Sequence, residues 1–305
     1  MRPALLVVAC AALIAAQFSQ RLTTVTVAVE DSDGRFVEDL TAADFSVNVD
    51  GRTVPVEKVT RESTGLSVAV LLDLTTSAAW PGGAPAGAIH QTIRDHVLAT
   101  LPDDTAVTIG SFGRTVHWSG GFSSEQSEQV RSLRVAVSLP EAERTGPSPI
   151  WDAVNDALST LKAREGRQAV LLITDGQTTG NRLGLAEVAD RAIAAAVPIS
   201  IVFTGPSGLI RQTRELSAGV YPDRAVMQLA DATGGYYSAR PPSQSIQNAP
   251  VDALRKGSRA MRSVYRLEFI APVKPGFQRF VATTPNPQHR VRAPLGFKNT
   301  PASGR

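Results

Sequence analysis

Oxygen-bearing side chains are gathered at two points of this sequence, and each point directly follows an apolar run. At the first, Asp73, Thr75 and Ser77 alternate, so that one loop can turn a carboxylate and two hydroxyls inward together. At the second, Asp175 is followed by Gly176. Carboxylates and hydroxyls suit hard cations such as Mg²⁺ and Ca²⁺, and Mg²⁺ often takes its remaining ligand from a substrate or partner. The spacing therefore predicts a cation site that is open on one side.

The two apolar runs predict buried strands of a parallel sheet. Residues 67–72 and 169–174 are almost continuously apolar, which is typical of strands that are covered on both faces. In open α/β sheets, ligands bind at the carboxyl ends of the strands, above all where the strand order reverses. We therefore expect Asp73 and Asp175 to be delivered to one place at that edge.

These residues resemble the metal-ion-dependent adhesion site (MIDAS) of the von Willebrand factor A (VWA) domain, where Asp-x-Ser-x-Ser is followed by a distant Thr and a distant Asp-Gly. The resemblance implies that Asp73 is the first aspartate and Asp175 the late one. Thr75 and Ser77 then take the two serine positions. Ser148 takes the threonine position, because the segment from Ser148 to Ala153 is similar to the helix-opening stretch that follows it in the family.

Two hydroxyl positions are exchanged relative to the family pattern, with Thr for Ser at 75 and Ser for Thr at 148. Each exchange keeps the oxygen. The resemblance thus implies a bound Mg²⁺, or alternatively Mn²⁺ or Ca²⁺, and the implied ligands are Asp73, Thr75, Ser77, Ser148 and Asp175.

Alternating strands and helices are predicted around these residues, which favours a doubly wound, mostly parallel sheet in an α/β domain. The periodicity predicts helices at 89–101, 125–137, 150–163 and 185–196, and further strands at 106–112 and 198–203. The helix expected at 227–233 and the Gly-Gly-Tyr-Tyr after it resemble the last helix and edge strand of the family. We assign residues 64–242 to a VWA-like domain.

Alternating apolar and polar residues at both ends of the chain predict a smaller β module. Strands are expected at 25–29 and 45–49, with Asp50-Gly51 as a hairpin turn, and again at 265–270 and 277–283. Residues 243–305 are expected to form a helix and these late strands. Two strands alone are only marginally stable, so we expect the late strands to pair with the early ones of residues 21–63. This layout is similar to secreted bacterial VWA-related proteins, a resemblance that speaks to architecture rather than role.

The first twenty residues are predicted to form a signal peptide. A basic start is followed by the apolar residues 4–16, a stretch that is too short to span a bilayer. The chain is therefore expected to be exported, either to a periplasm or out of the cell. Cys10 is the only cysteine and follows a lipobox-like segment, but the short apolar stretch before it makes lipid anchoring the less favoured alternative. Cleavage would leave no disulfide and no cysteine nucleophile.

Basic residues are concentrated at the end of the chain. Residues 252–305 carry eleven Lys or Arg and two Asp or Glu, whereas the other residues carry twenty basic and twenty-six acidic side chains. We favour a solvated face that also docks on the acidic body over contact with an anionic surface. Binding to nucleic acid is not expected, because no recognised reading motif is present.

Enzyme classes fit the sequence poorly. The four histidines lack the His-Glu-x-x-His spacing, and neither a Gly-x-Ser-x-Gly elbow nor a P-loop occurs. One enzymatic alternative makes Asp73 the nucleophile of a Mg²⁺-dependent phosphoryl-transfer hydrolase. Another alternative is a metal-free VWA-fold scaffold, since Asp and Ser at strand ends often only cap helices or turns. Asp152 is expected to be a helix-dipole residue rather than a ligand.

We expect, in sum, an exported non-enzymatic binding protein. Its metal site is expected to capture an Asp or Glu of a protein partner, which would complete the coordination shell.

Overall fold

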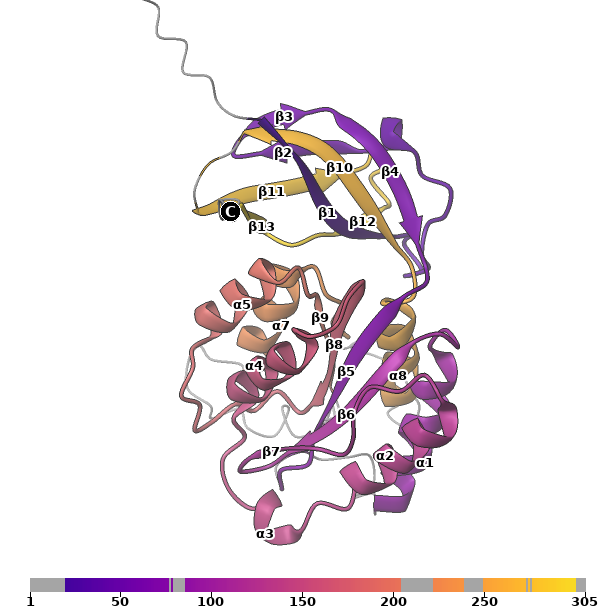
Figure 1. Ribbon diagram of the computed structural model, residues 1–305, viewed down its shortest axis with the longest axis vertical. Helices are drawn as coiled ribbons and strands as arrows, with labels where there is room; N and C mark the ends of the chain where they lie inside the picture. Colours follow the sequence, from indigo (N-terminus) through magenta and orange to yellow (C-terminus); the bar gives the residue numbers. More distant parts are fainter. Residues whose placement is uncertain are drawn as a thin grey trace, which may run out of the picture.

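A computed structural model describes residues 20–76, 78, 86–203, 222–238, 249–272, 274 and 276–299. The expected signal peptide, with Cys10, and the site residue Ser77 lie outside the described residues. Figure 1 shows an upper part made of strands and a lower part in which helices surround a sheet.

The lower part is an α/β domain built on a five-stranded sheet with the order β7-β6-β5-β8-β9. Its strands are β5 (Leu66–Asp73), β6 (Ala106–Phe112), β7 (Val116–Trp118), β8 (Arg167–Thr174) and β9 (Ile199–Phe203). All neighbouring pairs are parallel except β6 and β7. Every residue of β5 is buried, as the continuous apolar run predicts.

Helices cover both faces of this sheet (Figure 1). One face packs against α1 (Ala86–His96), α2 (Gln126–Ala136) and α8 (Ala249–Arg259), and the other against α4 (Ile150–Leu161), α5 (Leu185–Ala194) and α7 (Pro222–Thr233). Alternate residues of β5 enter opposite cores: Val68 and Val70 face the first, Ala69 and Leu71 the second. Short helical turns occur at Leu98–Thr100 and, as α3, at Glu141–Arg144.

The upper part is a β module of two four-stranded sheets. One has the order β12-β1-β10-β4, from Arg290–Arg292, Gln20–Glu30, Val264–Pro272 and Val56–Glu62. The other has the order β13-β11-β2-β3, from Gly296–Asn299, Gly276–Thr283, Ser46–Val49 and Arg52–Val54. A turn of 3-10 helix lies at Ala42–Asp44. The inner faces of the two sheets share one apolar core.

Strands from both ends of the chain thus build the module, because β10 lies between β1 and β4 and is antiparallel to both. The expected fold class, a mostly parallel α/β sheet with a smaller module of N- and C-terminal strands, is confirmed.

Three details differ from the sequence expectations. The helix expected at 89–101 ends at His96, and the last turn becomes 3-10 helix, as frayed helix ends often do. The edge strand expected after α7 is reduced to a single bridge between Tyr237 and Ile201. The edge strand β7 was not anticipated, because three residues carry too little alternation to be recognised.

The two parts are joined by contacts of the basic C-terminal region. Lys298 Nζ lies 3.2 Å from Asp190 Oδ2 on α5, and the Leu295 amide donates to the Ala232 carbonyl at 2.9 Å. Arg292 lies over the Tyr236 ring. Within the residues that the structure describes, no helix combines the length and apolar character needed to cross a membrane.

Candidate metal centre

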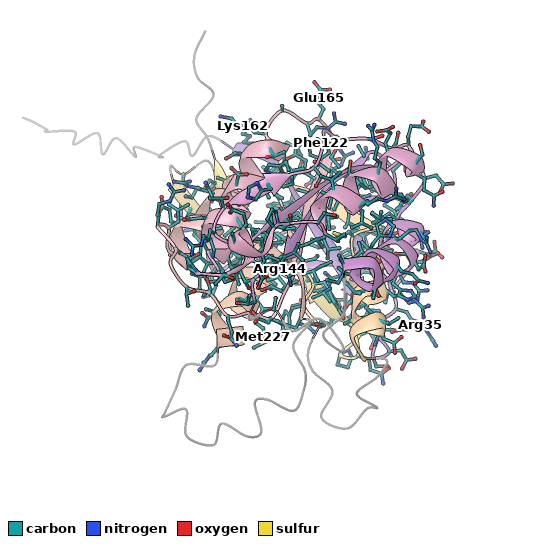
Figure 2. The ribbon with its side chains drawn as sticks, turned by 90° about the horizontal axis from the view of Figure 1, so that it is seen from below. Arg35, Phe122, Arg144, Lys162, Glu165 and Met227 are labelled. Atoms are coloured by element: carbon teal, nitrogen blue, oxygen red, sulfur yellow. The ribbon has the colours of Figure 1, made fainter. Side chains whose placement is uncertain are left out.

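The candidate centre is built around Asp73, the last residue of β5. Its side chain is fully buried at the carboxyl edge of the sheet. β5 is the central strand, between β6 and β8, so residues of both neighbouring strands and of their following loops can reach it. The loop after β5 is held by α3, since the Thr76 amide donates to the Arg144 carbonyl at 3.0 Å and Arg144 Nε donates to the Leu74 carbonyl at 2.9 Å. Figure 2 shows this end of the domain from below, with Arg144 near its middle.

Both carboxylate oxygens of Asp73 accept hydrogen bonds from hydroxyl groups. Thr75 donates to Oδ1 through its hydroxyl at 2.6 Å and through its amide at 3.1 Å. Thr174, at the end of β8, donates its hydroxyl to Oδ2 at 2.6 Å. Ser148 donates its hydroxyl to the same oxygen at 3.2 Å. Asp73 therefore gathers three hydroxyls from three segments of the chain.

Ser148 reaches Asp73 because the loop before α4 is tied to the loop after β8. The Ser148 amide donates to Thr179 Oγ1 at 3.0 Å, and the Thr179 amide donates back to the Ser148 carbonyl at 2.9 Å. The Trp151 amide donates to Asn181 Oδ1 at 2.7 Å. The side chain of Ser148 is buried as a result.

Asp175 lies next to this cluster but is not fully buried. Its Oδ1 accepts the Gln177 amide at 2.9 Å, which fixes the turn after β8. The Gly176 amide donates to Thr174 Oγ1 at 3.0 Å, so that the Thr174 hydroxyl is oriented toward Asp73. Gly176 adopts a positive φ of 81°, a conformation that side chains disfavour, which explains the glycine after Asp175.

Burial and a like charge both act on Asp73. The pKa of Asp73 is raised to about 6, chiefly by burial and to a smaller extent by the charge of Asp175, while the hydrogen bonds from Thr174 and Thr75 oppose the rise. The carboxylate form of Asp73 is thus only partly compensated by protein groups. A cation at this place would compensate both carboxylates.

The donor set fits a hard divalent cation. It consists of two carboxylates and several hydroxyls, all of them oxygen ligands. Over the described part of the chain, no group of three or more His, Cys, Asp or Glu side chains is placed to hold a metal ion, so a cation here would depend on hydroxyl ligands. Of the five residues that the sequence nominates, the structure brings Asp73, Thr75, Ser148 and Asp175 together. Their role as metal ligands stays a prediction, and Ser77 is not described.

Sequence reasoning missed Thr174, although a signal was present. Thr174 is the polar last residue of an otherwise apolar strand, directly before Asp175. Asp152 is expected from the sequence to be a helix-dipole residue rather than a metal ligand. It lies in the first turn of α4 and accepts hydrogen bonds from the amides of Arg182 and Leu183. Asp156, on the same helix, accepts the Trp118 ring N–H at 2.6 Å. Both carboxylates thus have structural partners.

No family model and no curated protein matches the sequence. Similar folds occur among solved structures. Proximal thread matrix protein 1 from the mussel byssus, in a crystal structure with a zinc-occupied MIDAS motif, matches with 14% identity and a TM-score of 0.51, over 70% of this chain and 50% of that chain.

Two further structures resemble the chain at lower TM-scores. BatB from Bacteroides thetaiotaomicron matches with 20% identity and a TM-score of 0.43, over 64% of this chain and all of that chain. The VWA domain of SpRpn10 matches with 15% identity and a TM-score of 0.44, over 63% of this chain and 96% of that chain. At such identities the likeness concerns the fold alone. With its central parallel sheet and helices on both faces, the α/β domain of this chain has the VWA fold.

Proposed function

We propose that this protein is an exported, non-enzymatic binding protein that captures an acidic group of a protein partner through a divalent cation. Asp73, Thr75, Ser77, Ser148 and Asp175 would hold the cation, with Mg²⁺ favoured over Mn²⁺ and Ca²⁺. An Asp or Glu of the partner would take the coordination position that the protein leaves open.

One observation carries this proposal: a fully buried carboxylate and a second carboxylate share the carboxyl edge of the sheet with three hydroxyls. Two acids brought together at one place repel each other, as the raised pKa of Asp73 reflects. A bound cation would offset this repulsion between the two carboxylates, which explains why both acids lie at one place. The mussel byssus protein, which is similar in fold, has a zinc-occupied MIDAS motif, and this supports the same interpretation.

The test is calorimetric titration of Mg²⁺ and Mn²⁺ into the metal-stripped protein without residues 1–20. Saturable binding is expected, with loss of binding in the variants Asp73→Ala and Asp175→Asn. Asp103→Asn is the matched control, because Asp103 is an exposed acid in the turn before β6, at the opposite edge of the sheet. Circular dichroism would check that each variant is folded. Absence of binding in every protein at millimolar metal would contradict the metal site.

Partner capture needs its own measurement. Binding to an array of peptides that contain Asp or Glu is expected in Mg²⁺, and not in chelator or with Asp175→Asn. Changing the peptide acid to its amide should abolish the signal. Signals that persist in chelator would contradict a cation-mediated contact.

A metal-free VWA scaffold is the second candidate, and the hydroxyl network favours it. Both oxygens of Asp73 already accept hydrogen bonds without a cation. In that case the titration would show no binding, and partner capture would survive Asp73→Ala. The same network argues against Asp73 as a nucleophile, because a fully buried carboxylate with both oxygens engaged cannot approach a substrate.

A further inference from the structure

A pocket of about 370 Å³ lies between the β module and the amino edge of the parallel sheet. Its lower wall includes the starts of β5 and β8 and the segment before β9, and its upper wall includes residues of β1, β10, β12 and β13. The candidate metal centre is at the other end of the same strands, so the two places are distinct. Small-molecule sites commonly have volumes of about 300–1,000 Å³.

Most of the pocket wall is apolar. The apolar residues that line it come from both parts of the protein and include Ala28, Val197, Met261, Val264 and Pro294. An apolar wall of this kind suits an aliphatic body, because burying each methylene is favourable by about 0.8 kcal/mol.

One cationic side chain of the pocket is incompletely paired. Arg292 of β12 is 7% exposed, and its Nη2 donates to Glu30 Oε1 at 2.9 Å. Its Nε is buried and has no hydrogen-bond partner within the described residues. Burial lowers the pKa of Arg292, while the charge of Glu30 opposes this. Burying a guanidinium N–H without a hydrogen-bond acceptor lowers the stability of the folded protein.

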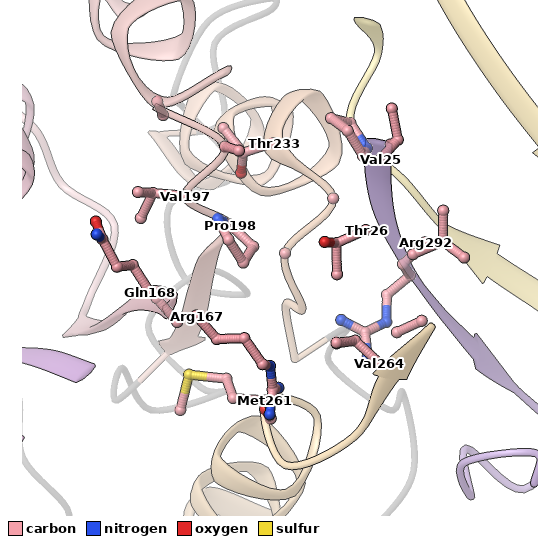
Figure 3. A pocket seen from close by; sticks show the side chains of 18 of the residues that line it. Val25, Thr26, Arg167, Gln168, Val197, Pro198, Thr233, Met261, Val264 and Arg292 are labelled. Atoms are coloured by element: carbon pink, nitrogen blue, oxygen red, sulfur yellow. The ribbon is translucent and has the colours of Figure 1, made fainter. Parts of the chain in front are cut away.

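A second cationic side chain enters the pocket from the opposite wall. Arg167, at the start of β8, is half-buried and donates to the Met261 carbonyl at 2.6 Å and to the Arg262 carbonyl at 3.3 Å. In the described part of the chain it forms no ion pair, whereas the nearby Arg266 contacts Glu62 at 3.1 Å. Figure 3 shows Arg167 and Arg292 reaching into the pocket from its two walls, with Val264 and Met261 nearby.

We propose that this pocket binds a small amphiphilic anion, with its head group at Arg167 and Arg292 and its short aliphatic chain along the apolar wall. An anionic head group would lie beside the guanidinium groups of Arg167 and Arg292 and would balance the charge of Arg167. The ligand would contact both parts of the protein at once and therefore favour their present arrangement.

The test is calorimetry of the chain without residues 1–20, with decanoate and decyl phosphate below their micellar concentrations and with decanol below its solubility limit. Saturable binding of one molecule is expected for the anions and at least tenfold weaker binding for decanol. Shortening the chain by two methylenes should weaken binding about fifteenfold. Whichever of the carboxylate and the phosphate binds more tightly identifies the head group as a fatty-acid type or a lipid-phosphate type.

Variants separate the pocket from general surface binding. Arg167→Met, which keeps an unbranched apolar stem and removes the charge, should weaken anion binding at least tenfold. Arg290→Gln is the charge-matched control, because Arg290 is exposed, lies on β12 and does not line the pocket. Since Arg292 holds the buried Glu30, Thr26→Phe is preferred to a change at Arg292: it fills the pocket, keeps every charge and should abolish binding. Equal affinities for decanoate and decanol, unchanged binding in both pocket variants, or no saturable binding would overturn the proposal.

Discussion

Thr174 donates its hydroxyl to Asp73 Oδ2 at 2.6 Å, which connects the ends of the neighbouring strands β8 and β5. The Gly176 amide orients that hydroxyl. A residue outside the five nominated ligands thus holds the central carboxylate in place.

Thr174→Val should destabilise the metal-free protein at pH 7 by about 1.5–3 kcal/mol, because the charged Asp73 loses a hydrogen bond inside the protein. Thr174→Ser keeps the hydroxyl and should retain most of the stability. Urea unfolding in chelator measures both. Equal stabilities of the Val and Ser variants would show that the hydrogen bond contributes little.

The raised pKa of Asp73 predicts how stability depends on pH in chelator. A carboxyl whose pKa is about 6 in the folded state and 3.8 in the unfolded state binds more protons when folded between these values. The contribution of Asp73 to the free energy of unfolding is therefore fully present below pH 3.8 and is lost as the pH rises through 6. The loss should amount to about 3 kcal/mol.

Unfolding at several pH values, compared with Asp73→Asn, isolates this contribution. The variant lacks the titrating group, so the difference between the two proteins should change between pH 4 and 6 and stay level above pH 7. A difference that does not vary with pH would contradict the assignment.

Ser148→Ala should weaken Mg²⁺ binding while costing the metal-free protein little, because the Ser148 hydroxyl makes only a 3.2 Å hydrogen bond to Asp73. With metal at a hundred times its dissociation constant, the parent protein should gain about 2.7 kcal/mol, and the variant should gain less at the same concentration. Thermal unfolding with and without MgCl₂ compares them, with Ser159→Ala on the exposed side of α4 as control. Identical gains would remove Ser148 from the ligand set.

Tyr265→Phe should destabilise the β module by about 1–3 kcal/mol. The Tyr265 hydroxyl donates to the Val37 carbonyl at 2.9 Å and accepts the Leu40 amide at 3.1 Å, so it ties β10 to the loop before β2. Urea unfolding measures the loss. Tyr237→Phe serves as control, since the Tyr237 hydroxyl makes no hydrogen bond within the described residues, and a similar loss there would contradict the explanation.

Much of the fold was predictable because its signals are local. The apolar runs at 67–72 and 169–174 and the amphipathic segments between them reflect which side chains must be buried, and the structure has β5, β8 and the expected helices there. Short elements such as β7 were missed, since three residues carry almost no periodicity.

The candidate site was predictable only in part. Asp73 and Asp175 follow strands of one parallel sheet, so their approach could be inferred from the strand ends alone. The contact of Thr174 with Asp73 could not be inferred in the same way, because its hydroxyl reaches Asp73 only through the pairing of β8 with β5. Ser148 was placed by resemblance, and the structure shows the loop contacts with Thr179 that bring it in.

The sequence by itself determined which segments are strands, which are helices, and which oxygen-bearing residues follow the strands, because burial and backbone propensity act over a few residues. Only the tertiary structure decided that β10 lies between β1 and β4, and that Arg167 and Arg292 meet in one pocket. These residues are far apart in the chain, and their contacts depend on how whole sheets pack rather than on any local pattern.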